Sequence, residues 1–124
     1  MRLHESAEMY IETIYRLSQE KGYVRSIDVA QAMGYSKPSV SRAVSQLKQG
    51  GYLLMDEKGR LTLTNEGVQV ARKVYERHTV LSGMLASLGV DAETAARDAC
   101  KIEHVISDAT FAAIKRHLEQ MGGR

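Results

Sequence analysis

Apolar residues recur at helical spacing through the first part of the chain, in three segments separated by glycines. Tyr10, Ile14 and Leu17 share one face of the first predicted helix. Ser26 is a candidate N-cap for the second helix and Ser36 for the third. The pattern therefore predicts helices over about residues 6–20, 26–33 and 37–49.

A short hairpin and three further helices are predicted for the rest of the chain. The runs 52–55 (YLLM) and 60–63 (RLTL) flank the polar segment 56–59, and Gly59 lies in a position that favours a turn. Helical spacing then returns, and Asp91 and Ser107 occupy positions where N-caps are expected. These helices are expected over about residues 64–88, 91–106 and 107–121.

The order of the first elements is typical of a winged helix-turn-helix, in which two short helices precede a two-stranded hairpin. The third predicted helix turns Val40, Val44 and Leu47 inward and leaves hydroxyl, amide and cationic side chains outside. No Asp or Glu lies between Met33 and Tyr52, so this face suits the phosphate-lined groove of DNA. The candidate DNA-binding residues are Ser36, Lys37, Pro38, Ser39, Ser41, Arg42 and Gln46 in the helix, and Lys58 and Arg60 in the hairpin.

The same polar face also fits an ordinary solvated helix. The chain has 17 Lys and Arg against 15 Asp and Glu, so its net charge of +2 does not by itself indicate nucleic acid. The interpretation as a DNA-binding unit depends instead on the helix order, the tight turn, the hairpin and the missing carboxylates together.

The composition is that of a folded protein. Hydrophobic residues make up 44% and charged residues 26% of the 124 positions, which argues against low-complexity disorder. No apolar run approaches the roughly 18 residues of a membrane span, and no secretory signal is recognised at the N-terminus. Because Cys100 is the only cysteine, an internal disulfide is excluded, and we expect a cytoplasmic protein.

Three candidate metal ligands lie close together in the second half of the chain. Cys100, Glu103 and His104 occupy positions i, i+3 and i+4, which share one side of a helix. Three residue types that bind metals on one face indicate a cation site. Further candidates are Met9 and Glu12 in the first predicted helix and His78 in the long helix.

Several of these residues also have an ordinary structural interpretation. Met9 suits a hydrophobic core, and Glu12 is spaced to pair with Arg16 one turn later. His78 suits an interior or a surface position, and a buried cysteine beside a surface Glu–His pair is common. The residues alone therefore leave both interpretations open.

Two stretches resemble the metal-bearing helices of the diphtheria toxin repressor family, which includes the manganese transport regulators. They are residues 7–15 (AEMYIETIY) and 98–108 (DACKIEHVISD), with the predicted winged helix between them. The resemblance covers essentially the whole chain and implies a metal-activated transcriptional repressor. It also implies an activating metal site made of Met9, Glu12, His78, Cys100, Glu103 and His104.

The implied ligand set mixes two branches of that family. Met9 and Cys100 are similar to the iron-responsive branch, whereas the manganese branch has carboxylates at both positions. Glu12 and His78 are similar to the manganese branch. Because thiolate and thioether favour Fe²⁺, Co²⁺, Ni²⁺ and Zn²⁺ over Mn²⁺, we expect Fe²⁺ as the cofactor. Mn²⁺ is the alternative, and Zn²⁺, Co²⁺ or Ni²⁺ are expected to bind in vitro.

The predicted fold is mainly α, with a winged helix-turn-helix and a small β-hairpin wing in residues 1–64. An all-helical dimerisation and metal-binding domain is expected in residues 65–124. Since domains of about 60 residues bury little core alone, a homodimer is expected.

The predicted function is repression of metal homeostasis genes through double-stranded operator DNA, with no enzyme activity, membrane or small-molecule substrate. One alternative is a metal-independent winged-helix regulator that senses a small molecule. Another is a zinc hydrolase, although no catalytic triad or phosphate-binding loop accompanies the cluster.

Overall fold

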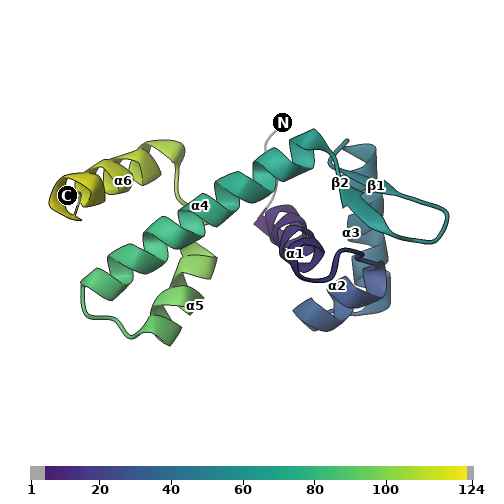
Figure 1. The fold of residues 1–124 in the computed structure, drawn as a ribbon, viewed down its shortest axis with the longest axis horizontal. Coiled ribbons are helices and arrows are strands. Elements are labelled where there is room, and N and C mark those ends of the chain that lie inside the picture. The colour runs from purple at the N-terminus through teal and green to yellow at the C-terminus, as the bar shows by residue number, and fades with distance from the viewer. Residues whose placement is uncertain (1–4, 123–124) are drawn as a thin grey trace. The chain divides into compact units, whose positions relative to one another are not determined.

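The computed structural model describes residues 5–122, which form six helices and one two-stranded hairpin (Figure 1). This arrangement confirms the predicted mainly helical fold with three helices before a small hairpin. Contacts divide the chain into two compact units, 1–73 and 74–124. The elements are α1 Glu5–Lys21, α2 Ser26–Met33, α3 Lys37–Gln49, β1 Leu53–Met55, β2 Leu61–Leu63, α4 Asn65–Ser87, α5 Ala92–Ile102 and α6 Asp108–Gly122.

The N-terminal unit has a core shared by α1, α2, α3 and the hairpin. The inward positions predicted for α3 are buried, because its apolar residues repeat at helical spacing on the side facing α1 and α2. Burial of such side chains is the main favourable term in holding the small unit together. The fully buried residues of this core include Ile11, Ile14, Val24, Val29 and Val40.

The ends of α2 and α3 show how short polar side chains set the helix boundaries. Ser36 caps α3 as predicted, because its Oγ accepts a hydrogen bond of 3.2 Å from the backbone N–H of Ser39. The prediction of Ser26 as the N-cap of α2 is wrong by one residue, since Arg25 holds that position. The carboxylate of Asp28, in the first turn of α2, accepts the Arg25 backbone N–H at 2.9 Å and so stabilises the N-terminus of the helix.

The hairpin forms the wing, and each strand is one residue shorter than the predicted runs 52–55 and 60–63. β1 and β2 pair antiparallel, with Leu53 opposite Leu63 and Met55 opposite Leu61. Gly59 lies in the turn with a φ of 78°, a backbone conformation that glycine adopts without strain. The Leu61 backbone N–H donates to the Val24 carbonyl at 2.7 Å and joins the wing to the loop before α2.

In the described part of the C-terminal unit, the buried apolar residues are Val74 and Leu81 of α4 and Ala95 and Ala99 of α5. Asp91 caps α5 as predicted, with its carboxylate accepting the Thr94 backbone N–H at 3.1 Å. The prediction that this helix reaches residue 106 is wrong, because α5 ends at Ile102 and a turn follows.

The boundary between the two compact units differs from the predicted domain boundary. The units divide between Lys73 and Val74, inside α4, whereas the domains predicted from the sequence divide after Thr64. The assignment of domains 1–64 and 65–124 stays a prediction.

Among the described helices, none combines the length and the apolar character needed to cross a membrane.

Candidate metal centre and DNA-facing helix

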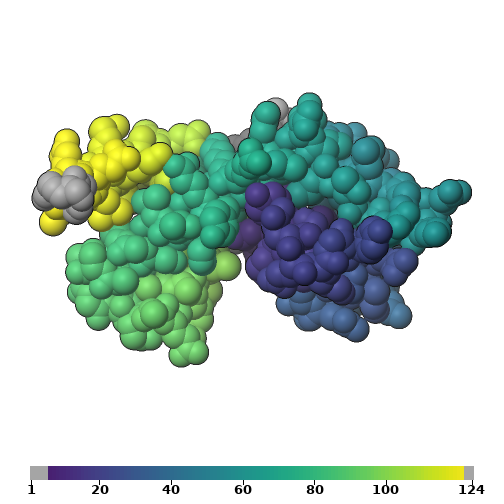
Figure 2. All heavy atoms as spheres, in the orientation of Figure 1, coloured from purple at the N-terminus to yellow at the C-terminus, as the bar shows by residue number. Residues whose placement is uncertain are grey.

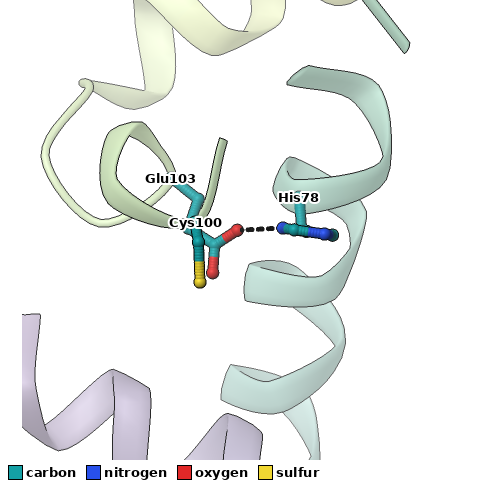
Figure 3. Close-up of side chains that lie close together, drawn as sticks. All are labelled: His78, Cys100 and Glu103. Atoms are coloured by element: carbon teal, nitrogen blue, oxygen red, sulfur yellow. Dashed lines mark hydrogen bonds and ion pairs between the residues drawn. The ribbon is translucent and has the colours of Figure 1, made fainter. Parts of the chain in front are cut away.

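His78, Cys100 and Glu103 converge in the C-terminal unit (Figure 3). His78 is on α4, Cys100 is in the last turn of α5, and Glu103 is the C-cap residue directly after α5. One ligand atom from each of the three lies within 4.8 Å of the others. The Nδ1 atom of His78 is 2.9 Å from Oε1 of Glu103, which gives this carboxylate oxygen a hydrogen-bond partner.

The carboxylate of Glu103 is the least ordinary feature of the cluster. Glu103 is 0% exposed, and its Oε2 atom accepts no hydrogen bond from the residues that the structure describes. The Nε2 atom of the buried His104 ring lies 3.3 Å from the same Oε2. Because a buried carboxylate is costly without full pairing, this oxygen points to a missing cationic partner.

The donor set fits a divalent transition metal. An imidazole, a thiol and a carboxylate are ligands that such ions share, and the thiol binds as the thiolate. Cys100 is exposed, so this ligand is accessible from solvent. The residues present therefore fit a bound divalent cation on two grounds, the unsatisfied buried oxygen and the chemistry of the donors.

The structure brings together only part of the predicted ligand set in one unit. His78, Cys100, Glu103 and His104 all belong to the C-terminal unit and lie within a few ångströms of Glu103. Met9 and Glu12 lie three residues apart on α1 of the N-terminal unit, and both are half-buried.

Arg77 is a neighbour of this cluster that the sequence analysis did not single out. Arg77 is only 7% exposed, and its guanidinium donates hydrogen bonds to the backbone carbonyls of Glu103 and Ile106. The available signal was a charged residue directly before His78 in an amphipathic helix. Such a residue normally predicts a surface position, so only the packed structure identifies it.

The outer face of α3 carries the predicted DNA-binding side chains. Figure 2 shows the surface of the N-terminal unit, with the wing in teal. The Ser36 Oγ donates to the Ser39 Oγ at 2.9 Å, so these two hydroxyls serve the helix cap. The exposed residues of the predicted set in this helix and its cap are Ser36, Lys37, Pro38, Ser41, Arg42 and Gln46, and Ser39 is half-buried.

The two predicted residues of the wing differ in how they are held. Lys58 is exposed. The Nε of Arg60 donates to the Asp56 carboxylate at 2.6 Å, and its guanidinium carbon lies 4.9 Å from the centre of the Tyr23 ring. The hydrogen bond to Asp56 raises the pKa of Arg60, because it favours the charged form of the guanidinium.

Two protein families match consecutive parts of the chain. Residues 2–61 match the family described as "Iron dependent repressor, N-terminal DNA binding domain". Residues 64–122 match "Iron dependent repressor, metal binding and dimerisation domain". The matches cover almost all of the described residues.

Curated relatives give the same result. The chain is 38% identical over 102 residues to "HTH-type transcriptional regulator MntR" of Bacillus subtilis (strain 168), covering 82% of this chain and 72% of the relative. It is 33% identical over 120 residues to "Transcriptional regulator MntR" of Escherichia coli O157:H7, covering 97% of this chain and 77% of the relative.

Solved structures share the fold. The manganese regulator SloR superimposes with a TM-score of 0.80 at 27% identity, covering 96% of this chain and 55% of SloR. A manganese-dependent transcriptional repressor in complex with manganese gives 0.81 at 28% identity, covering 90% of this chain and 52% of the repressor. The chain thus spans about half the length of these two proteins.

Proposed function

Because this chain belongs to the DtxR/MntR family of metal-dependent transcriptional repressors, we propose that its C-terminal cluster binds the activating cation. The proposed ligands in this cluster are His78, Cys100, Glu103 and His104. The observation that carries the proposal is the buried Glu103 carboxylate, whose Oε2 has no hydrogen-bond donor among the described residues.

The protein residues hold the site in a form that is ready for a cation. His78 hydrogen-bonds one oxygen of Glu103 and so orients the carboxylate, while Cys100 and His104 add donors beside it. A bound divalent cation supplies the positive charge that a buried carboxylate lacks. Loss of the cation therefore leaves these residues with an unbalanced buried charge.

We propose Fe²⁺ as the activating metal and Mn²⁺ as the alternative. The thiol of Cys100 favours Fe²⁺, because thiolates bind softer metals in preference to Mn²⁺. Two of the similar solved structures are described as manganese regulators, which supports Mn²⁺. Metal analysis of protein purified without oxygen distinguishes the two. Zn²⁺, Co²⁺ and Ni²⁺ serve as probes in vitro.

Met9 and Glu12 are further proposed ligands. Their assignment depends on residue type and on the resemblance to the family rather than on contacts within the C-terminal unit. Titration of the Met9→Ala and Glu12→Gln variants with Mn²⁺ tests it. Unchanged affinity in both variants would restrict the site to the C-terminal unit.

The proposed partners are operator DNA and a second copy of the chain. Ser41, Arg42 and Gln46 lie on the exposed face of α3, which has no carboxylate to repel phosphates, and Arg42 and Gln46 suit base edges. Lys58 and Arg60 suit the adjacent DNA backbone. A homodimer then presents two such helices to successive turns of the duplex, about 34 Å apart. We propose that genes of metal homeostasis are the targets.

The decisive experiment measures operator affinity of the whole chain without oxygen, with Fe²⁺, with Mn²⁺ and with a chelator. We expect tight binding with a metal and loss of binding with the chelator. Equal affinities in all three conditions would contradict the proposal. If repression also survived Cys100→Ala, the metal-independent class of winged-helix regulators would be favoured instead.

A further inference from the structure

The buried guanidinium of Arg77 connects the cluster to the turn between α5 and α6. Its Nη1 donates to the carbonyl of Glu103 at 3.1 Å and to the carbonyl of Ile106 at 2.8 Å. Its Nη2 pairs with the carboxylate of Asp108, the first residue of α6. One side chain of α4 therefore holds the two ends of this turn.

Arg77 stabilises the turn that follows the end of α5. The last carbonyls of a helix lack donors within the helix, and a cation at this end also interacts favourably with the helix dipole. Arg77 supplies both a charge and two N–H contacts to carbonyls in the turn. Its guanidinium carbon lies 5.4 Å from the centre of the Phe111 ring, so α6 also packs against the group.

Consecutive residues of α4 contact the same candidate ligand in two ways. Arg77 binds the main chain of Glu103, and His78 binds its side chain. The main-chain contact holds the backbone of Glu103 in place, and the side-chain contact holds its carboxylate in place. Cys100 precedes this fixed residue by one helical turn, and His104 follows it directly.

We propose that Arg77 is a positioning residue for metal binding, which holds the Glu103–Ile106 turn so that the carboxylate and its neighbouring ligands stay converged. Arg77 does not contact the cation, because the guanidinium is itself positively charged. The inference rests on the proposed metal site in the C-terminal unit. Partners that orient ligands in this way typically contribute 10–100-fold to metal affinity.

The alternative is that Arg77 merely clips α4 to α6, and the chain offers a matched control for that role. Glu76, the residue before Arg77, pairs with Lys115 of α6. This exposed pair joins the same two helices without touching the Glu103–Ile106 turn. A substitution at Lys115 therefore removes an α4–α6 contact and leaves the contacts of Arg77 in place.

The test compares Arg77→Met, Arg77→Lys and Lys115→Met in the full chain without oxygen. Affinities for Mn²⁺ and Co²⁺ are measured by competition with a chromophoric chelator. The visible absorption of the Co²⁺ protein reports the coordination geometry, and far-ultraviolet circular dichroism of the metal-free protein reports the fold.

We expect Arg77→Met to bind both metals about 10–100-fold more weakly, with a changed Co²⁺ spectrum and unchanged helix content. Arg77→Lys keeps the charge but not the fork of donors, so its affinity should fall between that of Arg77→Met and the wild type. Lys115→Met should bind within about twofold of the wild type, because a surface ion pair contributes little.

Three results would overturn the inference. Wild-type affinity and Co²⁺ spectrum in the folded Arg77 variants would leave the metal site standing but remove Arg77 from it. An equal loss of affinity in Lys115→Met would reduce Arg77 to a helix clip. Failure of both Arg77 variants to fold would make the residue a requirement of the helical unit. A wild-type chain that binds neither metal would instead refute the proposed function itself.

Discussion

Glu103 combines complete burial with a carboxylate oxygen that lacks a hydrogen-bond donor among the described residues. Proteins rarely leave such a group without a partner, because desolvation of a charge is not offset by weak contacts. His78 and His104 each lie beside one of its oxygens, at 2.9 and 3.3 Å. At the scale of one residue, the structure thus favours a site whose charge is completed by a ligand.

Glu103→Gln keeps the size of the side chain and removes its charge. Because loss of a residue that only orients a ligand weakens metal binding by up to about 100-fold, loss of the ligand charge itself should weaken it by at least that much. At a metal concentration of 100 times the wild-type Kd, the cation stabilises the wild type by about 2.7 kcal/mol and such a variant by only about 0.4 kcal/mol. Thermal unfolding with and without Mn²⁺ measures this difference. Glu119→Gln, an exposed change on α6, should behave as the wild type. An undiminished metal-induced rise in Tm in Glu103→Gln would exclude this carboxylate as a ligand.

Short polar side chains determine where α3 begins. Ser36 accepts the Ser39 backbone N–H, and no acidic residue lies in the first turn of α3. The free N–H groups of this turn and the helix dipole therefore stay available to a phosphate. The cap and the candidate DNA surface are thus parts of one element.

Ser36→Ala removes this cap and should lower the free energy of unfolding by about 1 kcal/mol. Ser45→Ala is the matched control, because Ser45 is exposed on the same helix away from its start. Surface changes of that kind usually alter stability by less than about 0.5 kcal/mol. Urea denaturation of the two variants measures the difference, and equal stabilities would show that the cap contributes nothing.

The wing depends on the ionised form of Asp56. Its carboxylate accepts the backbone N–H groups of Arg60 and Lys58, at 2.8 and 2.9 Å, and the side chain of Arg60. The backbone N–H of Arg60 is the largest influence that lowers the pKa of Asp56 below its ordinary value. A lowered pKa means that the charged form stabilises the folded wing.

The stabilisation from Asp56 should be complete above its ordinary pKa of about 4 and be lost as the pH falls through the lowered value. Amide hydrogen exchange at Lys58 and Arg60, corrected for the intrinsic pH dependence, measures the opening of the turn. Asp56→Asn should abolish this pH dependence while the core helices keep theirs. Protection that stays constant down to pH 2 in the wild type would refute the role of Asp56.

The whole chain contains two small units, and units of this size bury limited apolar surface. In the C-terminal unit, Leu81 is fully buried within the subunit, whereas Leu88 is 73% and Val105 61% exposed. The family matched by this half is described as a metal binding and dimerisation domain. Burial of such residues against a second copy would add apolar contact that one chain lacks.

Sedimentation of the metal-loaded chain should therefore give a homodimer, and operators should contain two half-sites about 10 base pairs apart. Insertion of about five base pairs rotates one half-site to the opposite side of the duplex and should abolish joint binding. Gel shifts with the natural and the lengthened spacing provide the measurement. A monomer that binds both spacings equally would contradict this assembly.

Much of the fold was predictable because helix periodicity and caps act over a few residues. The pattern predicted the inward face of α3, the caps Ser36 and Asp91 and the hairpin. The end of α5 at Ile102 was missed, because the following turn is held by Arg77 from another helix. The N-cap of α2 was misplaced by one residue, because Asp28 closes the helix through its backbone contact with Arg25.

The sequence by itself determined the helical pattern, the carboxylate-free face of α3 and the residue types able to bind a cation. Those properties depend only on neighbours within one or two helical turns, so they follow directly from the amino-acid sequence. Only the tertiary structure decided that His78 hydrogen-bonds Glu103, which lies 25 positions away in the sequence. It also decided that the buried Arg77 holds the turn between α5 and α6. Such contacts depend on how helices pack, and packing is a collective result of the whole core rather than of any local segment.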